Sequence, residues 1–502
     1  MPKTRPGKPR WAGASIRRSS IRVIPPELLT LIFEHIELAE PSILASVGLV
    51  CRQWKDIIYS NPKFWRSLNC HAHVAPAHNQ GLVEFVQRWF GRSNDLLLSF
   101  SLEMRPPRPS AFDLRNLTNY LMLTKRWREL SFTLVPTGDN SSELRQFSWP
   151  WIKALFNSAR AFSKEPGETA CWGALESLEL IGRELSLFSP GEMPVLALAD
   201  IAPNVKNLRI VFRRFSSLFN LNSTHINMHN LKRLEIDGEI EWVTPDMLLA
   251  FYLRLITEVT QLEELKLLDY YSKLAFPTTF EFASPPIRNA TLRRLTLHDG
   301  PGVRFFLRGI SLPSLDSLAI MKPESGTTTI ETLSLPLDES VKQLLDQSGC
   351  KLKEFKLENA HISKNGLIGL LPAMEGLETL VLNTAFSNGN DATEFLLRIK
   401  EGGGHHGKKV PESRVLPRLR NLSFTVGAFI TPKTKFRLQE TFKAVVDDVS
   451  RWWPQSATSA SGADTTLNPE QRVVRLENAQ LVMHHIDGAS SVLISRGEKR
   501  EW

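Results

Sequence analysis

The feature that most constrains the fold is a degenerate apolar repeat, Φ-x-x-Φ-x-Φ, which occurs eleven times between residues 127 and 424. Alternation at the fourth and sixth positions is the period of a β-strand, so each repeat predicts a short strand that sends two side chains into a shared interior. Most repeats start 22 to 31 residues after the previous one, a period typical of solenoids. The repeats are Trp127-Leu130-Phe132, Leu175-Leu178-Leu180, Val205-Leu208-Ile210, Leu231-Leu234-Ile236, Leu262-Leu265-Leu267, Leu292-Leu295-Leu297, Leu315-Leu318-Ile320, Ile330-Leu333-Leu335, Leu352-Phe355-Leu357, Leu377-Leu380-Leu382 and Leu419-Leu422-Phe424.

One such unit cannot bury its remaining face alone, so neighbouring units must stack. The pattern resembles that of leucine-rich repeats, and the resemblance implies an α/β solenoid. The regular family keeps an Asn or Cys three positions after the sixth, where its side chain bonds backbone groups of the turn. This chain has Arg183, Tyr270, Ala360 and Ala385 there, so we expect irregular curvature. The alternative is a set of amphipathic strands in an ordinary α/β domain.

A second segment, residues 23–68, is richer in apolar residues than the chain as a whole, with 24 of 46 against 42%. Pro26 in a first helical turn and Glu27 beside the positive helix end predict a helix over residues 26–37. At about 100° per residue, its apolar positions cover an arc of about 200°, roughly twice the stripe that packing on one side needs. Further helices are expected at residues 42–51 and 53–60, ended by Pro62. A unit this small has more apolar surface than it can bury by itself.

The same segment resembles an F-box. The resemblance rests on three runs in order: Ile24-Pro25-Pro26-Glu27-Leu28-Leu29-x-x-Ile32-Phe33, Leu44-x-x-Val47-x-Leu49-Val50-Cys51-Arg52-x-Trp54 and Pro62-x-Phe64-Trp65-x-x-Leu68. It departs from the commonest pattern only at Ile24, where Leu is usual. The resemblance implies a three-helix module that docks on the Skp-family subunit of cullin-RING ubiquitin ligases. The expected docking residues are Pro25, Leu28, Leu29, Ile32, Val47, Val50, Trp54 and Trp65, some of which belong to the module's own core.

An ordinary helical subdomain packed on the following domain is the alternative, because the wide apolar arc does not distinguish the two. The expected order of units is a disordered basic tail at 1–20, the F-box at 21–68, a connecting strand and helix region at 69–125, the leucine-rich-repeat-like solenoid at 126–430, and a C-terminal capping helix and tail at 431–502. Within these units we expect a strand at 96–102, helices at 116–123 and 433–453, and a late strand at 471–483. The clusters Gln87-Arg88-Trp89, Leu96-Leu97-Leu98 and Lys125-Arg126-Trp127-Arg128 are similar to segments of fungal F-box proteins.

The net charge of +8 does not indicate a nucleic-acid-binding fold. The first 22 residues contribute +7 and contain no acid, so the rest carries about +1. A nuclear-localisation or phosphate-binding patch is the alternative reading of this tail. Four scattered cysteines fit a reducing compartment, and no apolar run predicts a spanning helix or a secretory signal. We therefore expect a cytoplasmic and/or nuclear protein.

No motif indicates catalysis, a cofactor or a metal. Cys70, His71, His73 and His78 have no recognised zinc spacing, and His405 and His406 lie in a glycine-rich loop. Cys51 belongs to an apolar helix and is expected to be core. Phosphate-binding, GxSxG and HExxH motifs are absent from the sequence.

The sequence thus predicts a non-enzymatic substrate-recognition adaptor of a Skp-cullin-F-box ubiquitin ligase. A protein-interaction scaffold outside any ligase is the second hypothesis, and a hydrolase on an α/β scaffold is the third. Side chains beside the buried strand positions are expected to bind the target protein: Arg233, Glu235, Asp237, Glu264, Lys266, Arg294, His298, Glu354, Lys356 and Glu358.

Overall fold

The computed structural model describes residues 24–36, 40–72, 79–104, 115–135, 150–163, 170–185, 198–216, 228–241, 245–270, 285–322, 336–360, 362–383, 386, 389–401, 416, 418–426, 432–451 and 478–483. Three helices begin this part of the chain: α1 (Pro26–Glu34), α2 (Pro41–Gly48) and α3 (Arg52–Ser60), followed by a 3₁₀ turn, η2 (Pro62–Trp65). Helix α1 begins at a proline and carries Glu27 in its first turn, as expected from the missing N–H and the helix dipole.

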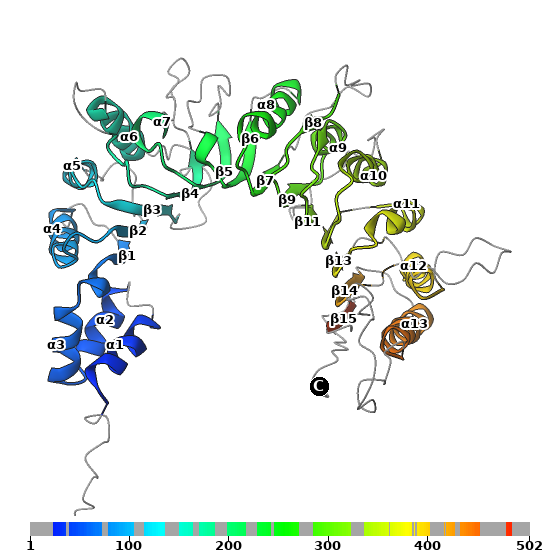
Figure 1. The fold of residues 1–502 in the computed structure, drawn as a ribbon, viewed down its shortest axis with the longest axis horizontal. Coiled ribbons are helices and arrows are strands. Elements are labelled where there is room, and N and C mark those ends of the chain that lie inside the picture. Colours follow the sequence, from blue (N-terminus) through cyan, green and yellow to red (C-terminus); the bar gives the residue numbers. More distant parts are fainter. Residues whose placement is uncertain are drawn as a thin grey trace, which may run out of the picture.

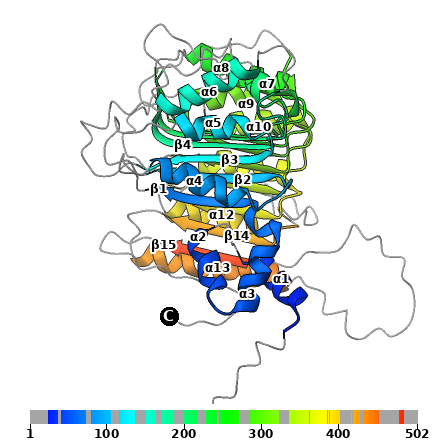
Figure 2. The ribbon, with the colours of Figure 1, turned by 90° about the vertical axis from the view of Figure 1, so that its left-hand side faces the viewer.

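A 13-stranded parallel sheet follows, and its strands neighbour one another in chain order. It forms an arch, with the strands on the inner side and helices on the outer side (Figure 1). Seen from the side of the first strands, the three N-terminal helices lie below those strands (Figure 2). The strands are β1 (Ser67–Ala72), β2 (Leu98–Met104), β3 (Trp127–Leu134), β4 (Ser177–Leu185), β5 (Asn207–Ser216), β6 (Arg233–Glu241), β7 (Glu264–Tyr270), β9 (Arg294–His298), β11 (Ser317–Met321), β12 (Glu354–Glu358), β13 (Thr379–Asn383), β14 (Asn421–Val426) and β15 (Asn478–Met483).

Helices or turns connect the strands, as parallel pairing requires. The α-helices are α4 (Asn79–Phe90), α5 (Arg115–Leu123), α6 (Pro150–Ser163), α7 (Leu198–Ile201), α8 (Pro245–Glu258), α9 (Pro301–Arg308), α10 (Leu337–Ser348), α11 (Lys364–Leu370), α12 (Gly389–Glu401) and α13 (Pro432–Arg451). Two 3₁₀ turns, η6 (Met228–Asn230) and η7 (Leu371–Met374), and a two-stranded sheet of β8 (Ile287–Arg288) and β10 (Ile310–Ser311) complete the described connections.

The apolar repeat sets the register of the sheet. Its fourth positions pair in an unbroken row from Leu130 on β3 to Leu422 on β14. Each of the thirty repeat residues in the described part is at most 5% exposed. The core therefore lies between the sheet and its outer helices. The repeat Ile330-Leu333-Leu335 lies outside the described residues, and β11 pairs directly with β12.

The segment expected to connect the F-box to the repeats contributes β2, two residues later than expected, and α5. It also contains most of β1 and all of α4, which were not predicted. The expected C-terminal helix is α13, and β15 lies at the end of the expected late strand. The basic tail, His73, His78, His405, His406, Ala385 and the side chains of Arg183 and Tyr270 lie outside the described residues.

Candidate functional site

Helix α1 has two apolar faces, only one of which is covered. Leu29 and Phe33 are 1% and 0% exposed, and Phe33 packs edge-on against Trp54, with ring centroids 4.9 Å apart. The side chains of Leu28, Leu31 and Ile32 are 51%, 51% and 47% exposed. At about 100° per residue these three span about 100° of the helix, next to the buried stripe. The wide apolar arc therefore divides into an internal half and an open half.

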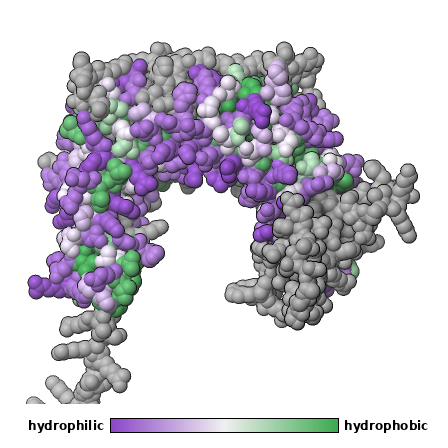
Figure 3. Space-filling model, viewed as in Figure 1, coloured by the Kyte–Doolittle hydropathy of each residue, from purple (hydrophilic) through white to green (hydrophobic). Residues whose placement is uncertain are grey.

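The turn between α2 and α3 adds to the exposed apolar surface of this module. Leu49 is 85% exposed and Val50 is 54% exposed, while Ile36 after α1 is 38% exposed. Hydrophobic residues gather on the three-helix module below the first strands, whereas the inner rim of the arch is hydrophilic (Figure 3). We call the exposed residues Leu28, Leu31, Ile32, Ile36, Leu49 and Val50 the apolar patch.

The predicted docking residues fall into two groups. Pro25, Leu28, Ile32 and Val50 are exposed, whereas Val47 and Trp54 are half-buried against the core. Leu29 and Trp65 are internal: Trp65 is 3% exposed, and its Nε1 donates to the Ile58 carbonyl at 2.9 Å. Leu29 and Trp65 are therefore the members of the expected set that belong to the module's own core. Leu31, Ile36 and Leu49 were omitted from the predicted set, although Leu31 and Ile36 belong to the predicted apolar arc.

An aromatic cluster joins the three-helix module to the sheet. Trp65 and Trp89 of α4 meet edge-on at 4.8 Å, and Trp89 Nε1 donates to the Ser67 carbonyl at 3.1 Å. The Arg92 guanidinium lies 4.3 Å from the Trp65 ring and 5.0 Å from the Tyr59 ring. Cation–π contacts of this kind add to packing, so the three-helix module is joined to the first part of the arch by direct contacts.

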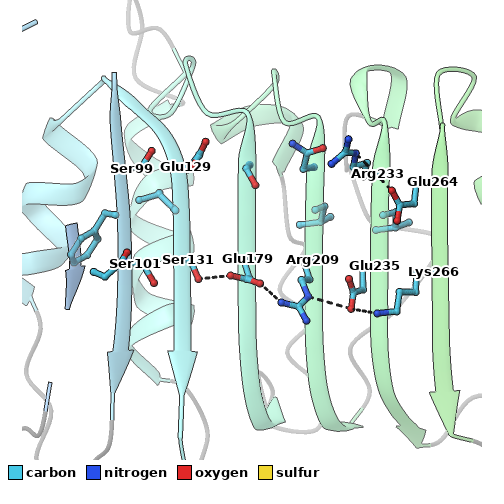
Figure 4. Close-up of a pocket in the computed structure, with 17 residues that line it drawn as sticks. Ser99, Ser101, Glu129, Ser131, Glu179, Arg209, Arg233, Glu235, Glu264 and Lys266 are labelled. Atoms are coloured by element: carbon cyan, nitrogen blue, oxygen red, sulfur yellow. Dashed lines mark hydrogen bonds and ion pairs between the residues drawn. The ribbon is translucent and has the colours of Figure 1, made fainter. Parts of the chain in front are cut away.

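The inner face of the arch carries a ladder of ion pairs. Ser131 on β3 donates to Glu179 on β4, Glu179 pairs with Arg209 on β5, Arg209 with Glu235 on β6, and Glu235 with Lys266 on β7 (Figure 4). These residues occupy one row of the sheet register. Charges of opposite sign face each other on neighbouring strands, so most of the charge in this row is neutralised internally.

A neighbouring row continues the same arrangement toward the C-terminal half. Glu264 pairs with Arg233 at 3.8 Å and with Arg294 at 2.9 Å. On β12, Glu354 accepts hydrogen bonds from Lys356 at 2.7 Å and from Ser317 at 2.6 Å. Burial raises the pKa of Glu354, but these hydrogen bonds outweigh it, so that its pKa lies below the ordinary value. The predicted target-binding residues Arg233, Glu235, Glu264, Lys266, Arg294, Glu354 and Lys356 therefore lie on the inner face.

Asp237, His298 and Glu358 each directly follow the sixth position of their repeat. Glu358 and Asp237 are half-buried there, and burial raises the pKa of Asp237, an effect that Lys266 opposes. His298 is only 5% exposed. The prediction that His298 lines a target surface is therefore corrected, because neighbouring residues bury its side chain almost completely.

A hollow of about 420 Å³ lies on the inner face between β1 and β7. On β1 to β5 half of its lining residues have small polar side chains, and from β5 onward it consists mostly of the paired charged residues (Figure 4). The lining residues are Asn69, Ser99, Phe100, Ser101, Glu129, Leu130, Ser131, Ser177, Glu179, Asn207, Leu208, Arg209, Arg233, Leu234, Glu235, Glu264 and Lys266.

Cys70, Cys171 and Cys350 are buried and do not form a reactive site, whereas Cys51, which was expected to be core, is only half-buried. Burial raises the pKa of the Cys70 thiol to about 12 and the pKa values of Cys171 and Cys350 to about 11, which keeps these thiols protonated at neutral pH. Within the residues that the structure describes, no three His, Cys, Asp or Glu side chains could hold a metal ion. None of the described helices is long and apolar enough to cross a membrane.

No curated protein matches this chain. Eighteen chains of solved structures do. One is a Bacteroides fragilis protein, 10% identical, with a TM-score of 0.25; the match covers 75% of this chain and 72% of that one. Another is TLR13 in its complex with ssRNA13, 15% identical, with a TM-score of 0.29; the match covers 66% of this chain and 38% of TLR13.

A family model, described as F-box-like, matches residues 21–71. This segment contains α1, α2, α3 and η2, together with the apolar patch. Residues 21–71 of the chain are an F-box-like domain.

Proposed function

We propose that this protein is a substrate-recognition adaptor of a Skp-cullin-F-box ubiquitin ligase. The F-box-like domain docks on a Skp-type subunit and through it on a cullin, and the arch binds a target protein. The adaptor contributes proximity, because a target held beside a charged conjugating enzyme reacts at a raised effective concentration. In this proposal the chain itself is not an enzyme, needs no cofactor, and acts in the cytoplasm and/or the nucleus.

The apolar patch is the observation that carries the proposal. Fully burying a Leu, Ile or Val side chain contributes about 1.5–3 kcal/mol, so several half-exposed side chains on one small module favour a covering partner. Leu29 and Phe33, on the internal half of α1, already pack into the core. The chain's own core therefore does not need the residues of the apolar patch. An F-box-like domain with an open apolar surface is what docking on a Skp-type subunit requires.

The arch supports the target-binding half of the proposal. We infer that it is an irregular leucine-rich-repeat solenoid, since its repeats stack in one register and the described helices between the strands lie on the outer side (Figure 1). A curved inner face lined by charged and polar side chains suits a protein target. Ion pairs already neutralise many of these side chains, so the inner face as a whole has no single preferred sign of charge.

Capture by a purified Skp-type subunit tests the docking half. The full chain should be retained, and the double variant Leu28→Asp plus Ile32→Asp should lose retention, because two charges would be buried without partners. The matched control is Leu97→Asp plus Leu123→Asp, since these side chains are 48% and 68% exposed outside the patch. Equal retention of both double variants would contradict the adaptor role.

The second candidate is a leucine-rich-repeat interaction scaffold that acts outside any ligase. The same inner face favours it, and only the apolar patch separates the two. If the unaltered chain is not captured by the Skp-type subunit, the scaffold function remains and the adaptor function is excluded.

A further inference from the structure

The hollow on the inner face is made by a local change in side-chain size. The lining of its β1 to β5 part includes six short polar side chains, which leave space beside the long ion-paired residues of β5 to β7: Ser99, Ser101, Ser131, Ser177, Asn69 and Asn207. The volume of about 420 Å³ lies within the range of about 300–1,000 Å³ that ligand sites occupy. Hydroxyl and amide oxygens on this lining can accept hydrogen bonds from a ligand.

The charges around the hollow do not cancel. Its lining contains four carboxylates, of Glu129, Glu179, Glu235 and Glu264, and three cations, of Arg209, Arg233 and Lys266. The ladder engages Glu179 and Glu235 with two of the cations, and Glu264 pairs with the third. Glu129 stands apart from this network.

Glu129 has neutral neighbours in the sheet. It pairs in register with Ser99 on β2 and Ser177 on β4. In the same row the first cation is Arg233, three strands away, which at about 4.8 Å per strand is roughly 14 Å. Arg128 Nε lies 4.0 Å from Glu129, at the limit of an ion pair, but the same nitrogen lies 3.0 Å from Glu176. Salt screens charges beyond about 8–10 Å, so Arg233 neutralises Glu129 only weakly.

We propose that this hollow binds an arginine side chain from an extended segment of the target protein. Glu129 is the ionic anchor, and the serine and asparagine oxygens accept the remaining guanidinium N–H groups. Arginine fits better than lysine because its planar fork carries five donors, which a lining rich in acceptors can satisfy. This assignment rests on the proposed target-binding role of the arch and adds the chemical class of the target segment.

Selection of a random-peptide display library on the full chain tests the assignment. Peptides enriched on the unaltered chain should share an arginine, and the enriched peptides should bind the Glu129→Gln variant roughly tenfold more weakly, as expected for loss of one charge-assisted hydrogen bond. Ser177→Leu should weaken binding as well, because it fills the hollow without changing charge. Glu375→Gln, an exposed carboxylate at the end of η7 that belongs neither to the hollow nor to the expected target-binding residues, is the matched control and should bind the peptides as the unaltered chain does.

Three outcomes would overturn the assignment. They are enrichment of acidic or apolar peptides, equal binding of the arginine peptides to the unaltered chain and to Glu129→Gln, and a selection that enriches no peptide at all. The selection does not involve the Skp-type subunit. If arginine peptides are enriched but the Skp-type subunit does not capture the chain, the arginine site is supported and the adaptor role is excluded. If the Skp-type subunit captures the chain but no arginine peptide is enriched, the adaptor role is supported and the arginine site is excluded.

Discussion

Two consecutive leucines on α1 provide a matched test of the division between core and docking surface. Leu28 is 51% exposed and Leu29 is 1% exposed, yet both belong to the same turn of the same helix. Each is changed to alanine, so that the chemical change is identical and only the surroundings differ. The two variants should fail in different assays.

The magnitudes follow from these exposures. Leu29→Ala leaves a cavity and should destabilise the F-box-like domain by about 2–5 kcal/mol, whereas Leu28→Ala should change stability by less than about 0.5 kcal/mol. About half of the Leu28 side chain remains to be buried on docking. That half is about 0.8–1.5 kcal/mol, so Leu28→Ala should weaken binding to a Skp-type subunit about 4- to 13-fold.

Two measurements separate the effects. Hydrogen exchange of the α1 amides reports the local stability of the domain within the full chain, and titration calorimetry with the purified Skp-type subunit reports affinity. The reasoning is refuted if Leu28→Ala speeds α1 exchange as much as Leu29→Ala does. It is also refuted if Leu28→Ala leaves the affinity unchanged.

Three further predictions concern ion pairing, thiol accessibility and pH dependence. Arg209→Gln removes the centre of the ion-pair ladder. Because these groups are partly exposed, we expect the free energy of unfolding to fall by less than about 1 kcal/mol, and by less still as the salt concentration is raised. A shift in the thermal unfolding temperature that does not depend on salt would argue against the ladder. Alkylation at pH 8 followed by peptide mass spectrometry should modify the half-buried Cys51 in the native protein, and only after unfolding should it modify Cys70, Cys171 and Cys350. The raised pKa of Asp237 means that the folded chain favours the protonated carboxyl group, so the stability of the fold falls as pH rises above the ordinary aspartate pKa. Asp237→Asn should therefore be more stable than the unaltered chain at pH 7 and should lose that advantage in acid. Glu354→Gln is the control, for which the opposite effect on stability is expected. The lowered pKa of Glu354 means that its charged form stabilises the fold above the ordinary glutamate pKa. This variant should therefore be less stable than the unaltered chain at pH 7, and the difference should disappear as pH falls.

Local features of the sequence explain which elements could be predicted. The repeat places apolar residues two apart on each strand, and a strand slipped by one residue would turn them away from the core, so Leu178 had to face the same side as Leu208, with which it lies in register. Strand β1 was missed because its short alternation, Leu68 and Cys70, overlaps the end of the F-box motif. Helix α4 carried a detectable signal, with Val83, Val86 and Phe90 on one buried face.

By itself, the sequence determined that strands would repeat and that α1 would carry more apolar surface than one face can bury, because both properties are periodicities along the chain. Only the tertiary structure decided that Leu28 is open while Leu29 is closed, that His298 is enclosed, and that Glu129 stands between two serines. Those properties depend on which residues lie on the neighbouring strand or helix, often 20 to 50 positions away in the sequence. Burial and charge pairing are set by neighbours in space, which no spacing along the chain specifies.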